Sequence, residues 1–205
     1  MFGIESEIAP GPAFALGSSE STLIEMTGAY AGILNGGSAV TPYGLVELRL
    51  QGDDTPLLEA GGGIRERVIS EAAARELTWM MYRVVQDGTG RRAGVEGWEI
   101  AGKTGTTQAA RDAWFIGFSA DYVAGVWMGY DDNTPLTGVT GSGLPADIWH
   151  ETMARVLDGV PVSPLPMQAP AAAQPEQQPS SGGLGMSDEQ ANQLIDMLLQ
   201  ELQNQ

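Results

Sequence analysis

The stretch WEIAGKTGTTQAARDAWFIGFSADYVAGVWMGY, residues 98–130, decides the fold of this 205-residue chain. Its extended, β-prone runs are separated by short polar turns, which predicts strands at 98–106, 112–119 and 122–130. Trp114, Ile116 and Phe118 alternate along the second run and should lie on one face. The second and third runs therefore predict an antiparallel hairpin.

A first helix is predicted before this stretch. Thr22 and Glu25 form a Thr-x-x-Glu capping box at its start. An apolar stripe follows, and Asn35-Gly36-Gly37 ends the helix because glycine enters the left-handed conformation without a Cβ clash. Residues 40–50 are predicted to continue as extended chain.

Two more helices flank the predicted strands. One starts after Ser70, a good N-cap, and stops at Asp87-Gly88. Its expected apolar stripe is Ala73, Leu77, Met80, Met81 and Val84. The other opens at Pro145, which suits a first helical turn. It is predicted to run through Trp149, Met153 and Val156 to Asp158-Gly159.

The composition excludes several classes of function. Ten basic and 26 acidic residues give a formal net charge of −16, which disfavours binding to nucleic acid or to an anionic membrane surface. The chain has no cysteine, so disulfides, thiolate metal sites and a cysteine nucleophile are excluded. Its start lacks the pattern of a signal peptide, and no stretch is long and apolar enough to predict a transmembrane helix.

Composition also divides the chain into three parts. Residues 1–160 carry the pattern of a compact domain. Residues 161–186 are rich in proline, alanine and glutamine, which is typical of a disordered linker. Residues 187–205 predict an acidic amphipathic helix that docks on a protein partner or on its own domain.

The segment Gly102–Thr107 carries the candidate chemistry. Lys103 is the only lysine in a chain with nine arginines. A compact ammonium with three rotatable donors acts differently from a planar guanidinium, so lysine at this position suggests a specific role.

The sequence around this lysine resembles the penicillin-binding proteins, most closely the transpeptidase domain of the bifunctional class A enzymes. Lys-Thr-Gly is one of three signature motifs of that serine acyltransferase superfamily. The resemblance covers roughly residues 4–158 and is carried by four segments: ALGSSESTLIEMTGAYAGILNGG, VVQDGTGRRA, AGKTGTTQAARDAWFIGFSADYVAGVWMGYDDNTP and TGSGLPADIW. It implies an α+β fold, the serine β-lactamase/penicillin-binding-protein transpeptidase fold, in which a five-stranded antiparallel sheet is flanked by helices.

The resemblance also implies roles for the motif residues. Lys103 would supply positive potential and donate toward a serine of the second motif, and the Thr106 amide would contribute to an oxyanion hole. The hydroxyls of Thr104 and Thr106 would bind the substrate's carboxylate or peptide backbone. Gly105 would let substrate lie against the strand, and Thr107 completes the substrate-binding set.

Two signature motifs of the family are absent. No serine has lysine three places later, as Ser-x-x-K requires, and none has asparagine two places later, as Ser-x-N requires. Both motifs precede ALGSS in the family. The chain therefore resembles the C-terminal part of a transpeptidase domain without its nucleophile, and we expect no acylation of this chain alone.

The implied function is that of a peptidoglycan D,D-transpeptidase, which needs no metal or cofactor. Its partners would be stem peptides that end in D-Ala-D-Ala, acceptor amines and, in the complete protein, β-lactams. The complete protein would act outside the cytoplasm, on the periplasmic face of the cytoplasmic membrane. We expect it to be attached there by an N-terminal anchor that is missing from this chain. Alternatives are a β-lactamase or D,D-carboxypeptidase relative and a non-catalytic interaction module.

Other candidate residues favour structural roles. His150 is expected on the surface of the third helix, and Asp131-Asp132-Asn133 predicts a hairpin exit turn rather than a metal site. Arg111 and Asp112 could order the loop beside the motif, and a solvated charge and a turn residue are equally good interpretations. Three tryptophans are expected in core or hairpin packing, or in one case in a substrate groove: Trp98, Trp114 and Trp127.

Overall fold

A computed structural model describes residues 2–8, 10–11, 17, 19–59 and 61–171 of the chain. The chain divides into two units, residues 1–169 and residues 170–205. Only the first unit is described at length. Most of the predicted linker and the whole predicted tail helix at 187–205 lie outside the described residues. No described helix is both long and apolar enough to cross a membrane.

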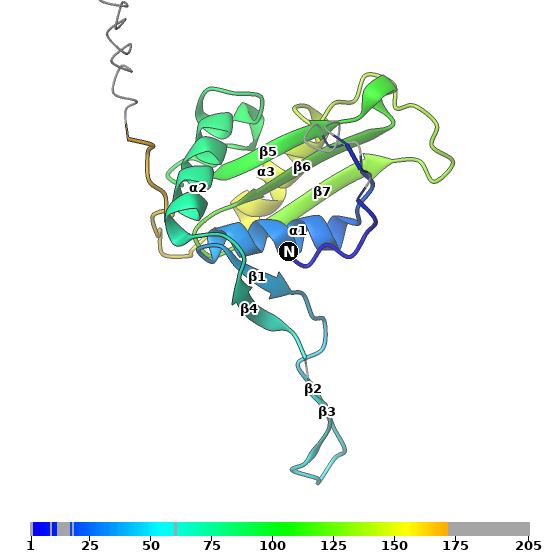
Figure 1. Cartoon of the computed structure of the whole chain (residues 1–205), viewed down its shortest axis with the longest axis vertical. Helices are drawn as coiled ribbons and strands as arrows, with labels where there is room; N and C mark the ends of the chain where they lie inside the picture. The colour runs from blue at the N-terminus through cyan, green and yellow to red at the C-terminus, as the bar shows by residue number, and fades with distance from the viewer. Residues whose placement is uncertain (1, 9, 12–16, 18, 60, 172–205) are drawn as a thin grey trace, which may run out of the picture. The chain divides into compact units, whose positions relative to one another are not determined.

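The three predicted strands form one antiparallel sheet (Figure 1). Strand β6 lies between the two others, so within the described residues the outer strands each have one unpaired edge. The register between neighbours is continuous, with no bulge. The strands are β5 (Ala101–Thr106), β6 (Asp112–Phe118) and β7 (Val123–Gly129).

The three predicted helices are present, and all three pack against the sheet, although only the last was expected there (Figure 1). They are α1 (Leu23–Leu34), α2 (Glu71–Gln86) and α3 (Leu144–Val156). One apolar core lies between α3 and the sheet, and a second lies between the sheet and the helices α1 and α2. This α+β sandwich agrees with the fold class implied by the resemblance.

The core under α3 depends on close contact between aromatic rings and glycine. The rings of Phe115 and Trp149 meet edge to face with centroids 5.3 Å apart. The indole nitrogen of Trp149 donates to the Ala124 carbonyl at 2.9 Å, so its burial leaves no polar atom unpaired. A Cβ at Gly117 would lie 3.1 Å from the Trp149 ring and 2.9 Å from the Ala101 carbonyl oxygen. Glycine at this position therefore allows the indole to pack on the strand.

The buried face of α2 differs from the predicted stripe. Ala74, Thr78, Met81 and Val85 are buried, whereas the predicted Ala73 and Met80 are exposed. A polar residue occupies this face because the Thr78 hydroxyl donates to the Ala74 carbonyl at 2.9 Å. The spacing of apolar residues could not predict this buried threonine, because its burial depends on a hydrogen bond within the helix.

The end of α3 shows a similar shift of one position. The predicted Val156 is 41% exposed, and Leu157 is buried in its place. Leu157 ends the helix as its C-cap and joins the core beneath α3.

Part of the predicted linker packs against the domain through Leu165. Residues 161–171 contain no helix or strand, but Leu165 is buried and packs in the core with Met81 and Phe118. The Leu165 amide donates to the Glu99 carboxylate at 2.8 Å. Leu165 therefore belongs to the packed core, and the disordered linker at 161–186 stays a prediction.

Between α1 and α2 in chain order, four short strands form a two-part arm that projects away from the sheet (Figure 1). Strand β1 (Ser38–Thr41) pairs with β4 (Gly63–Arg67), and β2 (Glu47–Arg49) pairs with β3 (Pro56–Glu59). The predicted extended run at 40–50 is thus divided between two strands. Leu48 and Leu58 face each other across the arm and are 50% and 53% exposed.

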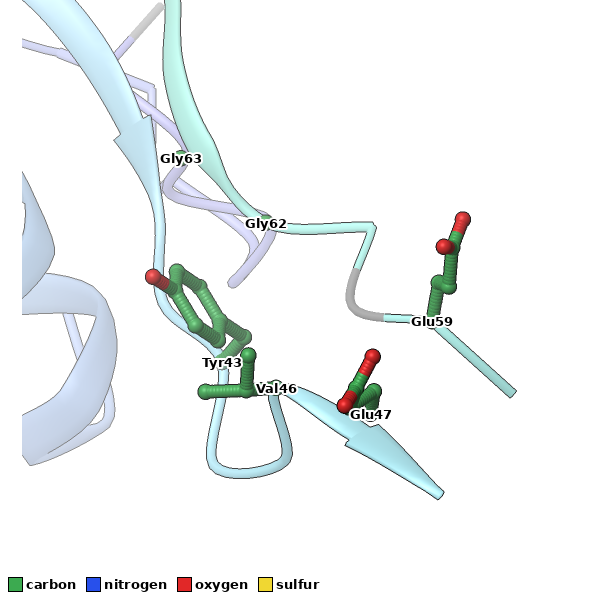
Figure 2. A pocket seen from close by; sticks show the side chains of 6 residues that line it. All are labelled: Tyr43, Val46, Glu47, Glu59, Gly62 and Gly63. Atoms are coloured by element: carbon green, nitrogen blue, oxygen red, sulfur yellow. The ribbon is translucent and has the colours of Figure 1, made fainter. Parts of the chain in front are cut away.

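An open hollow of about 320 Å³ lies where the two parts of the arm meet (Figure 2). Its lining residues are Tyr43, Val46, Glu47, Glu59, Gly62 and Gly63. None of them belongs to β5, so the hollow is separate from the Lys-Thr-Gly motif.

The predicted capping box is present at the start of α1, and Glu25 holds more than the helix. Its carboxylate accepts hydrogen bonds from the Thr22 amide at 2.9 Å and from the amides of Glu5 and Ser6 at 2.9 and 3.0 Å. The hydroxyls of Ser6, Ser21 and Thr22 also donate to it. These bonds, and that of the Ser6 hydroxyl most of all, hold the pKa of Glu25 far below its usual range.

We predict that Glu25 makes the stability of this chain depend on acid. Because its pKa is lowered on folding, its stabilisation is complete above the unfolded value of about 4.3 and decreases as the pH falls below it. Glu25→Gln should lower the melting temperature at about pH 6, and the gap to wild type should narrow by about pH 3. Thermal unfolding followed by circular dichroism measures both. Glu20→Gln, an exposed control, should show no gap, and a gap for Glu25→Gln that is independent of pH would refute this account.

Candidate active site

The motif Lys103-Thr104-Gly105-Thr106 forms the exposed half of edge strand β5. Lys103 and Thr106 are exposed, and the two residues between them are half-buried. Lys103 lies opposite Ile116, and Gly105 lies opposite Trp114. These four positions therefore lie on one face of the sheet, and another part of that face packs against α1. Thr104 and Thr106 lie on the opposite face of the sheet, with Phe115 and Ala113.

The backbone of β5 leaves alternate residues unpaired. Directly after the strand, the Thr107 amide donates to the Asp112 carbonyl at 3.0 Å. In an antiparallel ladder hydrogen-bonded and non-hydrogen-bonded pairs alternate, so Lys103 and Gly105 bond to β6. Gly102, Thr104 and Thr106 then point their N–H and C=O groups away from β6, toward the open edge. The edge thus presents the Thr106 N–H.

The Lys103 ammonium also reaches this edge. Its Nζ donates to the Thr104 carbonyl at 2.8 Å, which is one of the outward-pointing carbonyls. The positive charge therefore lies beside the unpaired N–H groups of the same strand.

Both threonine hydroxyls of the motif are held by partners distant in sequence. The Thr106 hydroxyl accepts from the Gly141 amide at 3.0 Å, which leaves its own hydrogen free to donate. The Thr104 hydroxyl lies 2.8 Å from the Thr89 hydroxyl. Thr89 and Gly141 were not among the residues predicted for the site, although the segments VVQDGTGRRA and TGSGLPADIW contain them.

Gly141 brings the segment before α3 against the motif. A Cβ at this position would overlap the carbonyl oxygens of Gly105 and Trp114 and would lie 2.9 Å from the Gly105 nitrogen. Only a residue without a side chain can approach the ladder this closely.

The turn between β5 and β6 is held by Thr107 and Asp112. The Asp112 amide donates to the Thr107 hydroxyl at 2.8 Å, and its carboxylate accepts from the Trp127 indole at 2.9 Å. Arg111 donates to the Asn133 carbonyl at 2.9 Å. These bonds favour the interpretation that Arg111 and Asp112 order the loop beside the motif.

The remaining candidates have structural contacts. His150 is half-buried, and its Nδ1 lies 2.9 Å from the Gly94 carbonyl. The predicted exit turn is confirmed, since the Asp132 carboxylate accepts the Thr134 amide at 3.0 Å and the pKa of Asp132 is lowered by its bonds to Thr134. Among the described residues no cluster of side chains could hold a metal.

The three tryptophans differ in their surroundings. Trp98 packs against the core under α3, whereas Trp114 and Trp127 lie together on the sheet with ring centroids 6.3 Å apart. Trp127 is 37% exposed. Hairpin packing is therefore confirmed for this pair, and a substrate contact stays a prediction.

The arrangement suits stabilisation of negative charge. An outward N–H, hydroxyls directed by other groups and an ammonium converge on one strand edge, where they can bind a developing oxyanion or a carboxylate. None of these groups is a nucleophile activated by a base, so this edge alone could bind negative charge but offers no group for covalent catalysis.

Comparisons with known proteins agree on the family. Residues 10–154 match the penicillin binding protein transpeptidase domain. Penicillin-binding protein 1A of Aquifex aeolicus is 36% identical over 150 residues, which cover 73% of this chain and 20% of that protein. Penicillin-binding protein 1A of Rickettsia typhi is 34% identical over 186 residues, which cover 80% of this chain and 24% of that protein.

Solved structures show the same fold. Penicillin-binding protein 1A from Haemophilus influenzae aligns with a TM-score of 0.68 and 26% identity over 80% of this chain and 30% of that one. PonA1 from Mycobacterium tuberculosis, in complex with penicillin V, aligns with a TM-score of 0.64 and 26% identity over 80% of this chain and 49% of that one. The chain spans only 20–24% of the length of the penicillin-binding proteins 1A of Aquifex aeolicus and Rickettsia typhi.

We predict that Gly141→Ala disrupts the motif. The added methyl group must displace the backbone of either β5 or the segment before α3, at a cost of about 1–3 kcal/mol. Denaturant unfolding should show this loss, while Gly44→Ala, whose Cβ would meet nothing within 4 Å, should leave stability nearly unchanged. Equal stability of the two variants would contradict the close approach.

Proposed function

The chain belongs to the penicillin-binding protein transpeptidase family, and we propose that it is the C-terminal part of a peptidoglycan D,D-transpeptidase domain. Two observations support this. The chain spans only 20–24% of the length of the two penicillin-binding proteins 1A, and its sequence lacks Ser-x-x-K and Ser-x-N. The nucleophilic serine would then lie outside this chain, and this chain alone would be inactive.

The outward-facing edge of β5 is the observation that carries the proposal. An extended peptide can add to an open sheet edge through main-chain hydrogen bonds, and Gly102, Thr104 and Thr106 offer such bonds here. Gly105 carries no side chain to obstruct a peptide. The hydroxyls of Thr104 and Thr106 would bind the carboxylate of the D-Ala-D-Ala terminus, and Thr107 would extend the set.

The reaction would proceed in two acyl transfers. The serine oxygen attacks the carbonyl carbon of the penultimate D-Ala, and the Thr106 N–H stabilises the oxyanion that forms. The C–N bond then breaks, and D-Ala leaves with a proton on its nitrogen. An acceptor amine attacks the resulting ester, loses a proton and returns the serine oxygen to its hydroxyl form.

Lys103 would contribute charge rather than a covalent bond. Its ammonium lies at the same edge as the oxyanion donor, so it would raise the positive potential there and donate toward a serine of the missing second motif.

We propose that the complete protein acts on the periplasmic face of the cytoplasmic membrane, to which it would be anchored. Its partners would be donor and acceptor stem peptides, and β-lactams would acylate it because they mimic the donor. The penicillin V complex of PonA1 supports this last point.

We predict that Lys103→Ala in the complete protein slows acylation by a fluorescent penicillin. Loss of a charged group beside the oxyanion should reduce the second-order rate constant of acylation by about 10²–10³-fold. Lys103→Arg should also be slow, because a guanidinium cannot occupy the place of a compact ammonium. Arg155→Ala, whose side chain is 80% exposed on α3, serves as control and should label at the wild-type rate. Unchanged labelling of Lys103→Ala would refute the role of the lysine.

The same reagent tests the missing nucleophile. Residues 1–205 alone should form no covalent adduct, whereas the complete protein should form one on a serine outside them. A stable serine adduct on the isolated chain, located by mass spectrometry, would overturn that part of the proposal.

A further inference from the structure

The turn that follows the motif has a backbone that needs external support. Ala109 and Ala110 both have positive φ, at 60° and 52°. In this left-handed region Cβ comes too close to a carbonyl oxygen, so two successive alanines there cost conformational free energy. Contacts outside these two residues must therefore hold the turn closed.

Asp112 supplies several of these contacts. With Thr107 it forms a reciprocal pair: the Thr107 amide donates to the Asp112 carbonyl at 3.0 Å, and the Asp112 amide donates to the Thr107 hydroxyl at 2.8 Å. That hydroxyl in turn donates to the Asp112 carboxylate at 3.3 Å. The other carboxylate oxygen accepts the Trp127 indole N–H at 2.9 Å, which connects the turn to β7.

These bonds close the ladder immediately after the proposed oxyanion donor. Thr106 is the last residue of β5, and strand ends fray when their last pair is weak. The Thr106 N–H belongs to the peptide that joins it to Gly105. That peptide keeps its outward direction only while the pairs on both sides, Gly105 with Trp114 and Thr107 with Asp112, stay closed.

We propose that Asp112 is a positioning residue for acyl transfer: with Thr107 and Trp127 it forms a latch that fixes the direction of the Thr106 N–H. The inference rests on the proposed function, since it concerns the oxyanion donor of that reaction. In this role Asp112 would contact neither substrate nor the reacting atoms. Its effect passes through the turn.

The test uses penicillin acylation of the complete protein and separates rate from amplitude. Asp112→Ala removes both carboxylate bonds. Because a displaced donor stabilises the oxyanion poorly, the acylation step should slow about 10–100-fold. All molecules should still label eventually, since the serine remains intact. A purely structural role would instead reduce the labelled fraction and leave the rate of the remainder unchanged.

Three further variants sharpen the result. Asp112→Asn can keep the Trp127 bond through Oδ1 and donate from its amide to the Thr107 hydroxyl, so it should restore most of the rate. Trp127→Phe removes only the indole donor and should slow acylation less than Asp112→Ala, with full amplitude. Asp121→Ala, at the opposite end of β6, is the matched control and should behave as wild type.

The outcomes distinguish the two proposals. If wild type forms no adduct, the proposed function itself fails. If wild type labels and Asp112→Ala labels at the rate of Asp121→Ala, the latch is overturned while the function stands. If Asp112→Ala does not fold, Trp127→Phe decides: a slowed rate at full amplitude supports the latch, and an unchanged rate refutes it.

Discussion

The pairing of β5 on one side only is the constraint on which the rest of the site depends. Strand β6 bonds to every second residue of β5, so Gly102, Thr104 and Thr106 keep their backbone groups for something else. A substrate peptide or an oxyanion can use these groups without competing with the sheet. If another strand covered this edge, the same sequence could not form the proposed site.

Packing elsewhere keeps that edge rigid. Phe115 and Trp149 fix the middle of β6 against α3, and on the same face the close approach of Gly141 holds the exposed half of β5. The strand therefore presents donors whose directions are set before substrate arrives. Such preorganisation is what oxyanion stabilisation requires, because donors that must reorient during the reaction lose much of their benefit.

The sequence alone predicted the elements that depend on local signals. The capping box at Thr22, the N-cap at Ser70 and the three strands were all confirmed. The buried face of α2 was shifted because Thr78 satisfies its hydroxyl within the helix. Lys103–Thr107 could be proposed as site residues because they are contiguous in the sequence. Thr89 and Gly141 could not be assigned to the site, since only tertiary folding brings them to it.

Amide hydrogen exchange of this chain, resolved residue by residue, tests the central claim most directly. The alternating ladder predicts that the amides of Lys103 and Gly105 are protected, while those of Thr104 and Thr106 exchange at least about 100-fold faster. Protection of Thr106 equal to that of Gly105 would mean that its N–H is already bonded. In that case the edge could not provide the oxyanion donor, and the account would be contradicted.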